Sequence, residues 1–234
     1  YDVFEKEQNK IFEDFTLNRN NRLKKLELIK EKYTIFNRNM ASEHECVFSS
    51  LSISNRKINT ILEIGTFDGV NSFLLSLLFD KAQIETIDLE SNTDDFKKFY
   101  NRSDTINEFV SSRNAVISKS NRITFKEMNS IKLYNSDKKF DLIWIDGAHG
   151  YPIVCIDIIN SLNLLNEGGL VMCDDIYTNK ITSDKMYYSN AAIETLRELA
   201  NEKIIEYKLI YKRLDVENNF NKDQRRFIGI FKKI

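Results

Sequence analysis

The sequence predicts an α/β fold, in which a doubly wound, mostly parallel sheet of seven strands carries helices on both faces. Three observations lead to this prediction. From Asn59 onward, short apolar runs alternate with longer amphipathic segments, which is typical of strand–helix–strand units. Glycine or acidic residues end several of the apolar runs, where a chain leaves a strand. The 234 residues, 42% of them hydrophobic, suffice for one sizeable core.

The strands are expected where apolar and β-branched residues form short runs. We place them at 60–64, 84–89, 123–127, 140–146, 169–173, 204–213 and 226–232. The helices are expected between these runs, at 71–79, 94–110, 153–165 and 190–203. The last two strands have no helix between them. They are therefore expected to form a C-terminal hairpin that adds an antiparallel strand to the sheet edge.

The N-terminal part of the chain has a different pattern. Residues 1–38 are interpreted as a helical extension and residues 39–234 as the α/β domain. Apolar residues between positions 3 and 29 recur at helical spacing, which predicts one or two amphipathic helices. Three roles stay open for these helices: covering the active site, packing on the domain, or pairing with a second copy in a homo-oligomer.

Composition excludes several classes of partner. The formal net charge of −1 gives no basic excess, so nucleic acid is not expected. No apolar run approaches the roughly 20 residues that a membrane helix needs, so no membrane is expected either. The three cysteines are widely spaced and odd in number, which favours reduced thiols over disulfides. We therefore expect a soluble, cytoplasmic protein that acts on a small molecule.

A glycine-containing motif follows the first strand. In the segment 63–69, Gly65 allows a sharp turn and Gly69 allows the backbone to approach a ligand closely. The segment lacks the other glycines of a dinucleotide-binding loop, and Glu63 suits a ligand that carries an ammonium group. Asp88, at the end of the second strand, can accept hydrogen bonds from both hydroxyls of a ribose.

The segments ILEIGTFDG and TIDLE resemble the first two motifs of class I S-adenosylmethionine-dependent methyltransferases, which have a Rossmann-like fold. The resemblance implies that the first acid holds the methionine part of the cofactor and the second acid holds the ribose. Asn129 and Ser130 follow the third strand and are candidates for binding the adenine edge. The expected cofactor-binding residues are Glu63, Gly65, Thr66, Phe67, Gly69, Ser72, Asp88, Leu89, Asn129, Ser130 and Asp146.

Three carboxylates are expected to converge beside this motif. Asp146 ends the fourth strand, and Asp174 and Asp175 end the fifth. Three acids without nearby cations repel each other, and oxygen ligands suit Mg²⁺ or Mn²⁺. The sequence therefore predicts a metal site formed by these three residues. His149 follows Asp146 by three residues and is the side chain best able to accept a proton near neutral pH.

The pattern D-G-x-H-x-Y, followed by G-G and an acidic pair, resembles the macrocin-type sugar O-methyltransferases. It is more distantly similar to catechol O-methyltransferase, which has a lysine where this chain has His149. The resemblance implies that Asp146, Asp174 and Asp175 bind Mg²⁺, and that His149 serves as the catalytic base. One departure is that relatives often have Glu where this chain has Asp174.

Alternatives to this assignment remain at the level of the sequence. One is a metal-independent N-methyltransferase, in which the acids bind a substrate amine. Another is a non-catalytic S-adenosylmethionine-binding subunit that docks on a partner through the N-terminal helices. A sugar or another polyhydroxylated metabolite is the expected substrate class. The segment 178–189 is interpreted either as a lid or as a plain surface loop, and Met40 and Ser42 are weaker candidates for cofactor contact.

Overall fold

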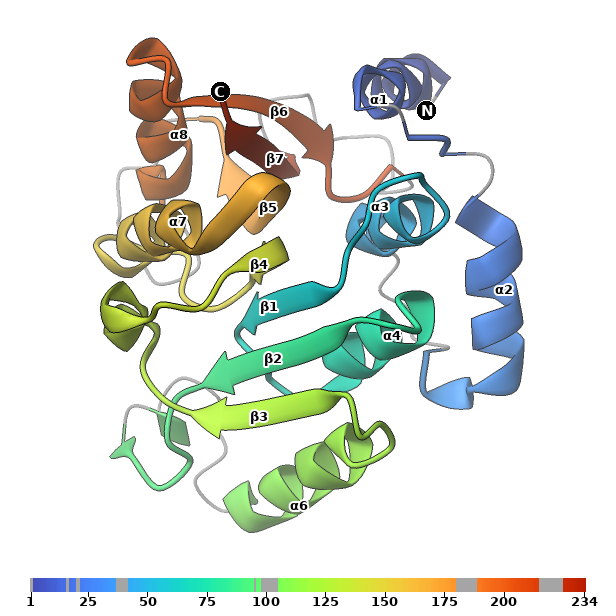
Figure 1. Ribbon diagram of the computed structural model, residues 1–234, viewed down its shortest axis with the longest axis vertical. Coiled ribbons are helices and arrows are strands. Elements are labelled where there is room, and N and C mark those ends of the chain that lie inside the picture. Colours follow the sequence, from blue (N-terminus) through green and yellow to red (C-terminus); the bar gives the residue numbers. More distant parts are fainter. Residues whose placement is uncertain are drawn as a thin grey trace.

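The computed structural model describes residues 2–15, 17–19, 22–36, 42–94, 96–97, 105–179, 189–214 and 225–234. Its strands form one seven-stranded sheet in the order β3-β2-β1-β4-β5-β7-β6 (Figure 1). β7 is antiparallel to both of its neighbours, whereas β1 to β5 pair in parallel. The strands are β1 (Thr60–Ile64), β2 (Gln83–Asp88), β3 (Ile123–Glu127), β4 (Phe140–Ile145), β5 (Leu165–Tyr177), β6 (Ile205–Tyr211) and β7 (Arg226–Lys233).

The predicted α/β fold, the sheet and the C-terminal hairpin are confirmed, but the position of the antiparallel strand is not. β7 lies between β5 and β6, so the edge strand is β6, which runs parallel to β5. The burial of the two strands explains this order. Five consecutive residues of β7 are buried, whereas in β6 the four consecutive residues 206–209 are exposed or partly exposed. A strand that is apolar on both faces is stabilised inside the sheet.

Helices cover both faces of the sheet (Figure 1). The α-helices are α1 (Asp2–Asp14), α2 (Arg22–Lys32), α3 (Glu43–Ser52), α4 (Val70–Leu78), α6 (Ile106–Ile117), α7 (Ile153–Leu164) and α8 (Ala191–Asn201). Two short 3₁₀ helices are η1 (Thr34–Phe36) and η2 (Ser130–Asn135). Within the described ranges, no helix is long and apolar enough to span a bilayer.

Two helices differ from the sequence prediction. In the segment expected to be helical, 94–110, residues 94, 96 and 97 are helical and residues 95 and 98–104 lie outside the described ranges, while α6 runs past the expected end to Ile117. Phe109, Arg113 and Ile117 recur every four residues along α6 and are buried together. Helix α3 was not predicted at all. Its apolar residues are few, but Val47, Phe48 and Leu51 share one buried face, and the surrounding polar residues hid this spacing.

The N-terminal helices pack on the same chain. Phe12 of α1 and Leu26 of α2 belong to the same buried cluster as Ile61 of β1. Gln8 of α1 donates a hydrogen bond to the Tyr211 carbonyl at 3.2 Å and accepts one from the Tyr211 N–H at 2.7 Å. Of the three roles left open by the sequence, packing on the domain is therefore observed, and pairing with a second copy stays a prediction.

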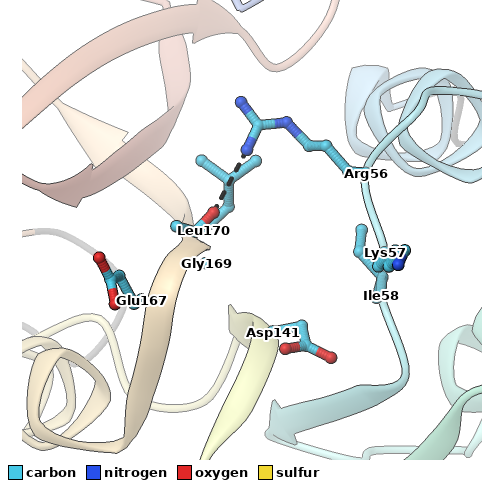
Figure 2. Close-up of a pocket in the computed structure, with 8 residues that line it drawn as sticks. Arg56, Lys57, Ile58, Asp141, Glu167, Gly169 and Leu170 are labelled. Atoms are coloured by element: carbon cyan, nitrogen blue, oxygen red, sulfur yellow. Dashed lines mark hydrogen bonds between the residues drawn. The ribbon is translucent and has the colours of Figure 1, made fainter.

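A small pocket lies at the edge of the sheet where the parallel strands begin (Figure 2). Arg56 donates a hydrogen bond across it to the Gly168 carbonyl at 3.3 Å. Asp141 accepts hydrogen bonds from the backbone N–H groups of Asn59 at 2.8 Å and Thr60 at 3.0 Å. These contacts hold the loop that enters β1, and the predicted site residues lie at the opposite ends of the strands.

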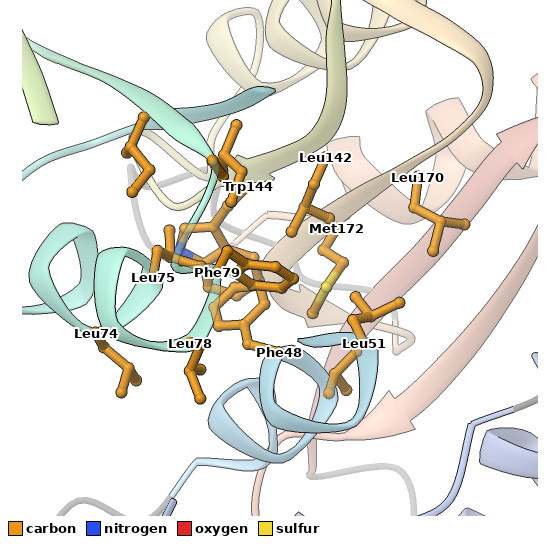
Figure 3. Close-up of a cluster of buried hydrophobic side chains, with 14 of the residues drawn as sticks. Phe48, Leu51, Leu74, Leu75, Leu78, Phe79, Leu142, Trp144, Leu170 and Met172 are labelled. Atoms are coloured by element: carbon orange, nitrogen blue, oxygen red, sulfur yellow. The ribbon is translucent and has the colours of Figure 1, made fainter. Parts of the chain in front are cut away.

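The core on one face is built around aromatic side chains (Figure 3). Trp144 of β4 is fully buried and meets Phe48 of α3 edge to face, with 5.4 Å between ring centroids. Leu142 and Met172 point to the same side, because alternate residues of a strand share a face. Ile143, Ile145, Val171 and Cys173 instead belong to the cluster under α7 and α8. Asp146 follows Trp144 by two residues and Asp174 follows Met172 by two residues, so both acids lie on the same side of the sheet as these core residues.

Candidate active site

The candidate site lies at the carboxyl ends of β1, β2, β4 and β5. The strand order reverses between β1 and β4, and ligands of open α/β sheets bind at such a switch point. The strand ends are aligned there, since Ile64 pairs with Ile145. The N–H of Gly65 donates to the Ile87 carbonyl at 2.9 Å, and that of Asp146 donates to the Ile64 carbonyl at 2.8 Å. The loops that follow β1, β2 and β4 therefore begin side by side at the carboxyl ends of the strands.

The turn after β1 requires glycine at position 65. Gly65 has a φ of +99°, and a Cβ placed there would lie 2.3 Å from the carbonyl oxygen of Asp146. Phe67 also has a positive φ, of 50°, and its side chain is 40% exposed. Gly69, with a φ of 75°, is the N-cap of α4. The loop thus turns sharply at Gly65 and presents its backbone and one aromatic ring at the start of a helix.

Asp88 fastens this loop to β2. Its Oδ2 accepts a hydrogen bond from the Phe67 N–H at 2.8 Å, and its Oδ1 accepts one from the Leu89 N–H at 2.8 Å. The residue is only 7% exposed. These two bonds fix the carboxylate at the end of β2, where its contact with a ribose stays a prediction.

Glu63 lies beneath the loop. Its Oε1 accepts a hydrogen bond from Asn71 at 2.7 Å, and its Oε2 accepts bonds from Thr86 at 2.7 Å and from Ser72. The residue is 1% exposed, and burial raises its pKa to about 7, although the three donors lower it. Glu63 therefore ties the start of α4 to β1 and β2. Its contact with an ammonium group stays a prediction.

Thr66 and Ser72 are also placed beneath the loop. Ser72 is fully buried, and its hydroxyl is used by Glu63. The hydroxyls of Thr66 and Thr86 are 2.7 Å apart. Both predicted cofactor residues thus support the loop from inside, and their contact with a cofactor stays a prediction.

The candidates for the adenine edge follow β3. The side-chain oxygen of Asn129 accepts a hydrogen bond from the Ile131 N–H at 3.0 Å and caps η2. The Ser130 carbonyl accepts a bond from Asn160 at 3.4 Å. Asn129 is thus fixed at the strand end, next to Asp88, whose carbonyl accepts a bond from the Met128 N–H at 2.7 Å.

Asp146 and His149 form the predicted catalytic pair. The Nε2 atom of His149 lies 3.5 Å from Oδ1 of Asp146, and His149 is buried while the Asp146 side chain is 36% exposed. Burial lowers the pKa of His149, but the hydrogen bond and charge of Asp146, with the charges of Asp175 and Asp174, outweigh it. The net effect raises the pKa of His149 above its ordinary value. The imidazole is thus oriented by a carboxylate that reaches solvent.

A β-bulge directs both acids of β5 to one side. Cys173 pairs with Gly229 and Ile176 pairs with Phe227, so β5 uses three steps where β7 uses two. Asp175 has a φ of 52°, a conformation that is uncommon for residues other than glycine. Without the extra residue, consecutive side chains would point to opposite faces. The bulge therefore brings Asp174 and Asp175 together.

The partner of these two acids is a lysine that the sequence prediction missed. Nζ of Lys212 lies 2.5 Å from Oδ2 of Asp174 and 2.7 Å from Oδ1 of Asp175. Arg226 lies 3.1 Å from both oxygens of Asp175. Burial lowers the pKa of Lys212, but the charges of Asp174, Asp175 and Asp146 outweigh it and raise this pKa. The two acids are thus neutralised by side chains of the hairpin.

Lys212 leaves a signal in the sequence only once the sheet order is known. It directly follows β6, and β6 runs parallel to β5, so its end reaches the same edge of the sheet. The acids alone gave no sign of this cation, because Lys212 lies 37 residues beyond Asp175 in the chain.

The described side chains do not fit the predicted divalent metal. A cation bound by Asp174 and Asp175 at about 2.1 Å would lie within about 5 Å of the Lys212 ammonium. A divalent and a monovalent cation about 4 Å apart repel by roughly 8 kcal/mol at an effective dielectric constant of about 20. Among the described residues, no group of three or more His, Cys, Asp or Glu side chains is arranged to hold a metal ion. The structure therefore does not support the predicted site of Asp146, Asp174 and Asp175.

A second histidine, to which the sequence analysis assigned no role, lies near the candidate site. His44 is on α3, its ring centroid is 5.2 Å from that of Trp144, and its Nδ1 is 2.7 Å from the Ser42 hydroxyl. The pKa of His44 is lowered, mainly by burial and further by the charge of Lys212, although the charge of Asp146 raises it. It was missed because α3 was missed.

Two weaker predictions fall on residues that the structure does not describe. Met40 lies outside the described ranges, as do Lys180, Lys185, Tyr187 and Tyr188 of the proposed lid. Ser42 is described, is buried and is the N-cap of α3.

The fold and site together define a Rossmann-like cofactor-binding domain, with a glycine turn after β1 and a carboxylate at the end of β2. Residues 62–176 match a protein family described as "Methyltransferase domain". The matched segment contains the candidate residues from Glu63 to Asp175. A search of curated proteins gave no significant match.

Solved structures share the fold. An S-adenosylhomocysteine-bound methyltransferase from Podospora anserina, PaMTH1, has a TM-score of 0.55 and 17% identity over 92% of this chain and 88% of its own. A protein from Staphylococcus aureus assigned as a caffeoyl-CoA O-methyltransferase has a TM-score of 0.55 and 17% identity over 95% and 98%. The O-methyltransferase TomG from Streptomyces achromogenes, in complex with S-adenosylmethionine, has a TM-score of 0.54 and 13% identity over 97% of each chain.

Proposed function

We propose that the protein is an S-adenosylmethionine-dependent O-methyltransferase that acts on a hydroxyl of a small molecule. The observation that carries the proposal is the His149–Asp146 pair, at 3.5 Å, at the end of β4 in a methyltransferase domain. This pair adjoins the loop that the family uses for the cofactor. A proton acceptor beside a methyl donor is what methylation of a hydroxyl requires.

The acids at this edge fit the chemistry of the cofactor. Glu63, Asp88 and Asp146 line the ends of three neighbouring strands, and negative charge attracts a ligand with sulfonium and ammonium groups. A pyrophosphate would be repelled there, which disfavours a dinucleotide. The relatives that contain S-adenosylmethionine or S-adenosylhomocysteine support the same assignment. When bound, the cofactor supplies an electrophilic methyl group.

His149 is the proposed general base. Its imidazole accepts the proton of the substrate hydroxyl as the oxygen attacks the methyl carbon, and Asp146 orients the ring and stabilises its protonated form. The raised pKa of His149 reflects the same carboxylate. No step of this mechanism depends on a metal ion, because the acids of β5 are held by Lys212. A sugar or another polyhydroxylated metabolite remains the proposed substrate class.

The N-methyltransferase alternative has less support. In that alternative the acids bind a substrate amine, yet Asp174 and Asp175 already contact Lys212, and Asp175 also contacts Arg226. Acids that are already paired with cations attract a charged amine less strongly. A hydroxyl group carries no such penalty, so the charges favour an oxygen substrate.

Methyl transfer from labelled S-adenosylmethionine tests the proposal. The purified protein is incubated with a panel of sugars, phenols and aliphatic polyols, and with the corresponding amines as a matched set. We expect label in a hydroxyl-bearing compound and a loss of that signal in His149→Ala. Label only in the amines, or cofactor binding with equal label in His149→Ala, would contradict the proposal.

A further inference from the structure

We propose that the ammonium group of Lys212 takes the place of a divalent cation at the ends of β4 and β5, so that this enzyme binds no metal there. The role of Lys212 in catalysis rests on the proposed function, whereas the test of metal binding does not. Its starting point is the disagreement between three converging acids and a lysine that already holds two of them.

The contacts of Lys212 resemble those of a bound cation. Its Nζ is within 2.7 Å of one oxygen from each of two carboxylates, and an ammonium group has three donors to share. Its side chain is 12% exposed and that of Asp174 is 3% exposed. The ion pair is therefore shielded from solvent. An ion pair on the protein surface would instead compete with water.

The fold fixes this lysine in position. Its N–H donates to the Arg226 carbonyl at 3.0 Å, and its carbonyl accepts a bond from the Glu43 N–H at 2.8 Å. The bulge at Asp175 turns a second carboxylate toward the same nitrogen. Backbone bonds to a strand and to a helix start thus hold the main chain of Lys212, while the carboxylates of Asp174 and Asp175 hold its ammonium group.

The consequence for chemistry concerns the substrate oxygen. An oxygen placed between His149 and Lys212 loses its proton to the imidazole and gains the methyl group, while the ammonium group stabilises the negative charge that develops on that oxygen. The proton ends on His149 and the cofactor leaves as the neutral thioether. No external cation enters this balance.

Direct titration with Mn²⁺ tests the inference without a substrate. Binding to the purified wild-type protein is followed by electron paramagnetic resonance, together with Lys212→Met and Lys208→Met. Lys208 is the matched control, since it lies on β6, the strand that Lys212 follows, and pairs with Asp14 at the surface at 3.3 Å. We expect no stoichiometric binding to wild type or Lys208→Met. Lys212→Met should bind Mn²⁺ at least about tenfold more tightly, because a repelling charge is removed.

Tight, stoichiometric Mn²⁺ binding by the wild-type protein would overturn the inference, and this result needs no variant. If Lys212→Met is unfolded by circular dichroism, Lys212→Arg replaces it and should bind Mn²⁺ as weakly as wild type. Cofactor affinity is measured in the same samples by calorimetry. If the wild-type protein binds neither the cofactor nor Mn²⁺, the proposed function is refuted and the inference about Lys212 is not. If it binds both, the inference that Lys212 takes the place of a metal ion is refuted and the proposed function is not.

Discussion

Oδ2 of Asp88 accepts a hydrogen bond from the backbone N–H of Phe67 at 2.8 Å. The carboxylate at the end of β2 therefore holds the loop that follows β1, in addition to its proposed contact with a ribose. Because the loop has positive φ values at positions 65, 67 and 69, it needs such an anchor. Cofactor recognition and loop conformation are thus linked through one side chain.

Replacing Asp88 should weaken cofactor binding. Asp88→Ala removes the acceptor for the Phe67 N–H and the proposed ribose contact, and a buried polar group left unsatisfied costs about 1–3 kcal/mol. We expect a loss of S-adenosylmethionine affinity on this scale by calorimetry. Glu90→Ala, at an exposed position two residues later, is the control and should bind as wild type. Equal affinity in the two variants would contradict the ribose assignment.

Gly65→Ala should destabilise the fold more than Gly168→Ala. Both glycines have positive φ values, but an added Cβ at Gly65 meets the Asp146 carbonyl at 2.3 Å, whereas one at Gly168 meets nothing within 4 Å. Left-handed strain alone costs about 1–2 kcal/mol, and a collision adds roughly 1–3 kcal/mol. Denaturant unfolding measures the difference. Equal free energies of unfolding would mean that the close contact between the two loops is unimportant.

The sequence predicted those parts of the site that depend on one strand at a time. Gly65, Asp88 and Asp146 each end a recognisable apolar run, and their order along the chain sets their order at the sheet edge. The parallel pairing of the strands then brings them together, as the prediction required.

Contacts between elements that are distant in sequence were not predictable in the same way. Lys212 reaches Asp174 only because β7 inserts between β5 and β6, and Asp175 joins them only because β5 contains a bulge. Neither strand order nor bulges leave a local sequence pattern. The three acids were therefore seen without their counterion, and a metal was predicted in its place.

Cofactor affinity should fall below neutral pH because of Glu63. Burial raises its pKa to about 7, so protons compete with a cationic ligand below that pH, and the neutral acid attracts an ammonium group less. We expect the dissociation constant to rise by up to tenfold per pH unit below 7. Calorimetry from pH 5 to 8 measures this slope, and Glu63→Gln should abolish it. An identical slope in that variant would assign the effect to another group.

His149→Ala should lose turnover and not cofactor affinity. Positioned proton transfer contributes about 10²–10⁴-fold to a rate, so methyl transfer to the acceptor found in the panel should fall on that scale. Calorimetry should give wild-type affinity for S-adenosylmethionine, since the substitution leaves Asp88 and the loop after β1 unchanged. A comparable loss of affinity would instead indicate a collapsed site.

The pH profile then decides which histidine is the base. A base acts only when deprotonated, so the rate should rise with pH through the pKa of the group responsible. The pKa of His149 is raised above the ordinary value of 6.5 by Asp146, whereas that of His44 is lowered below it by burial. We expect the acid limb of wild type to lie above pH 6.5, to persist in His44→Gln and to vanish in His149→Ala. An acid limb below that pH, lost in His44→Gln, would transfer the role of base to His44.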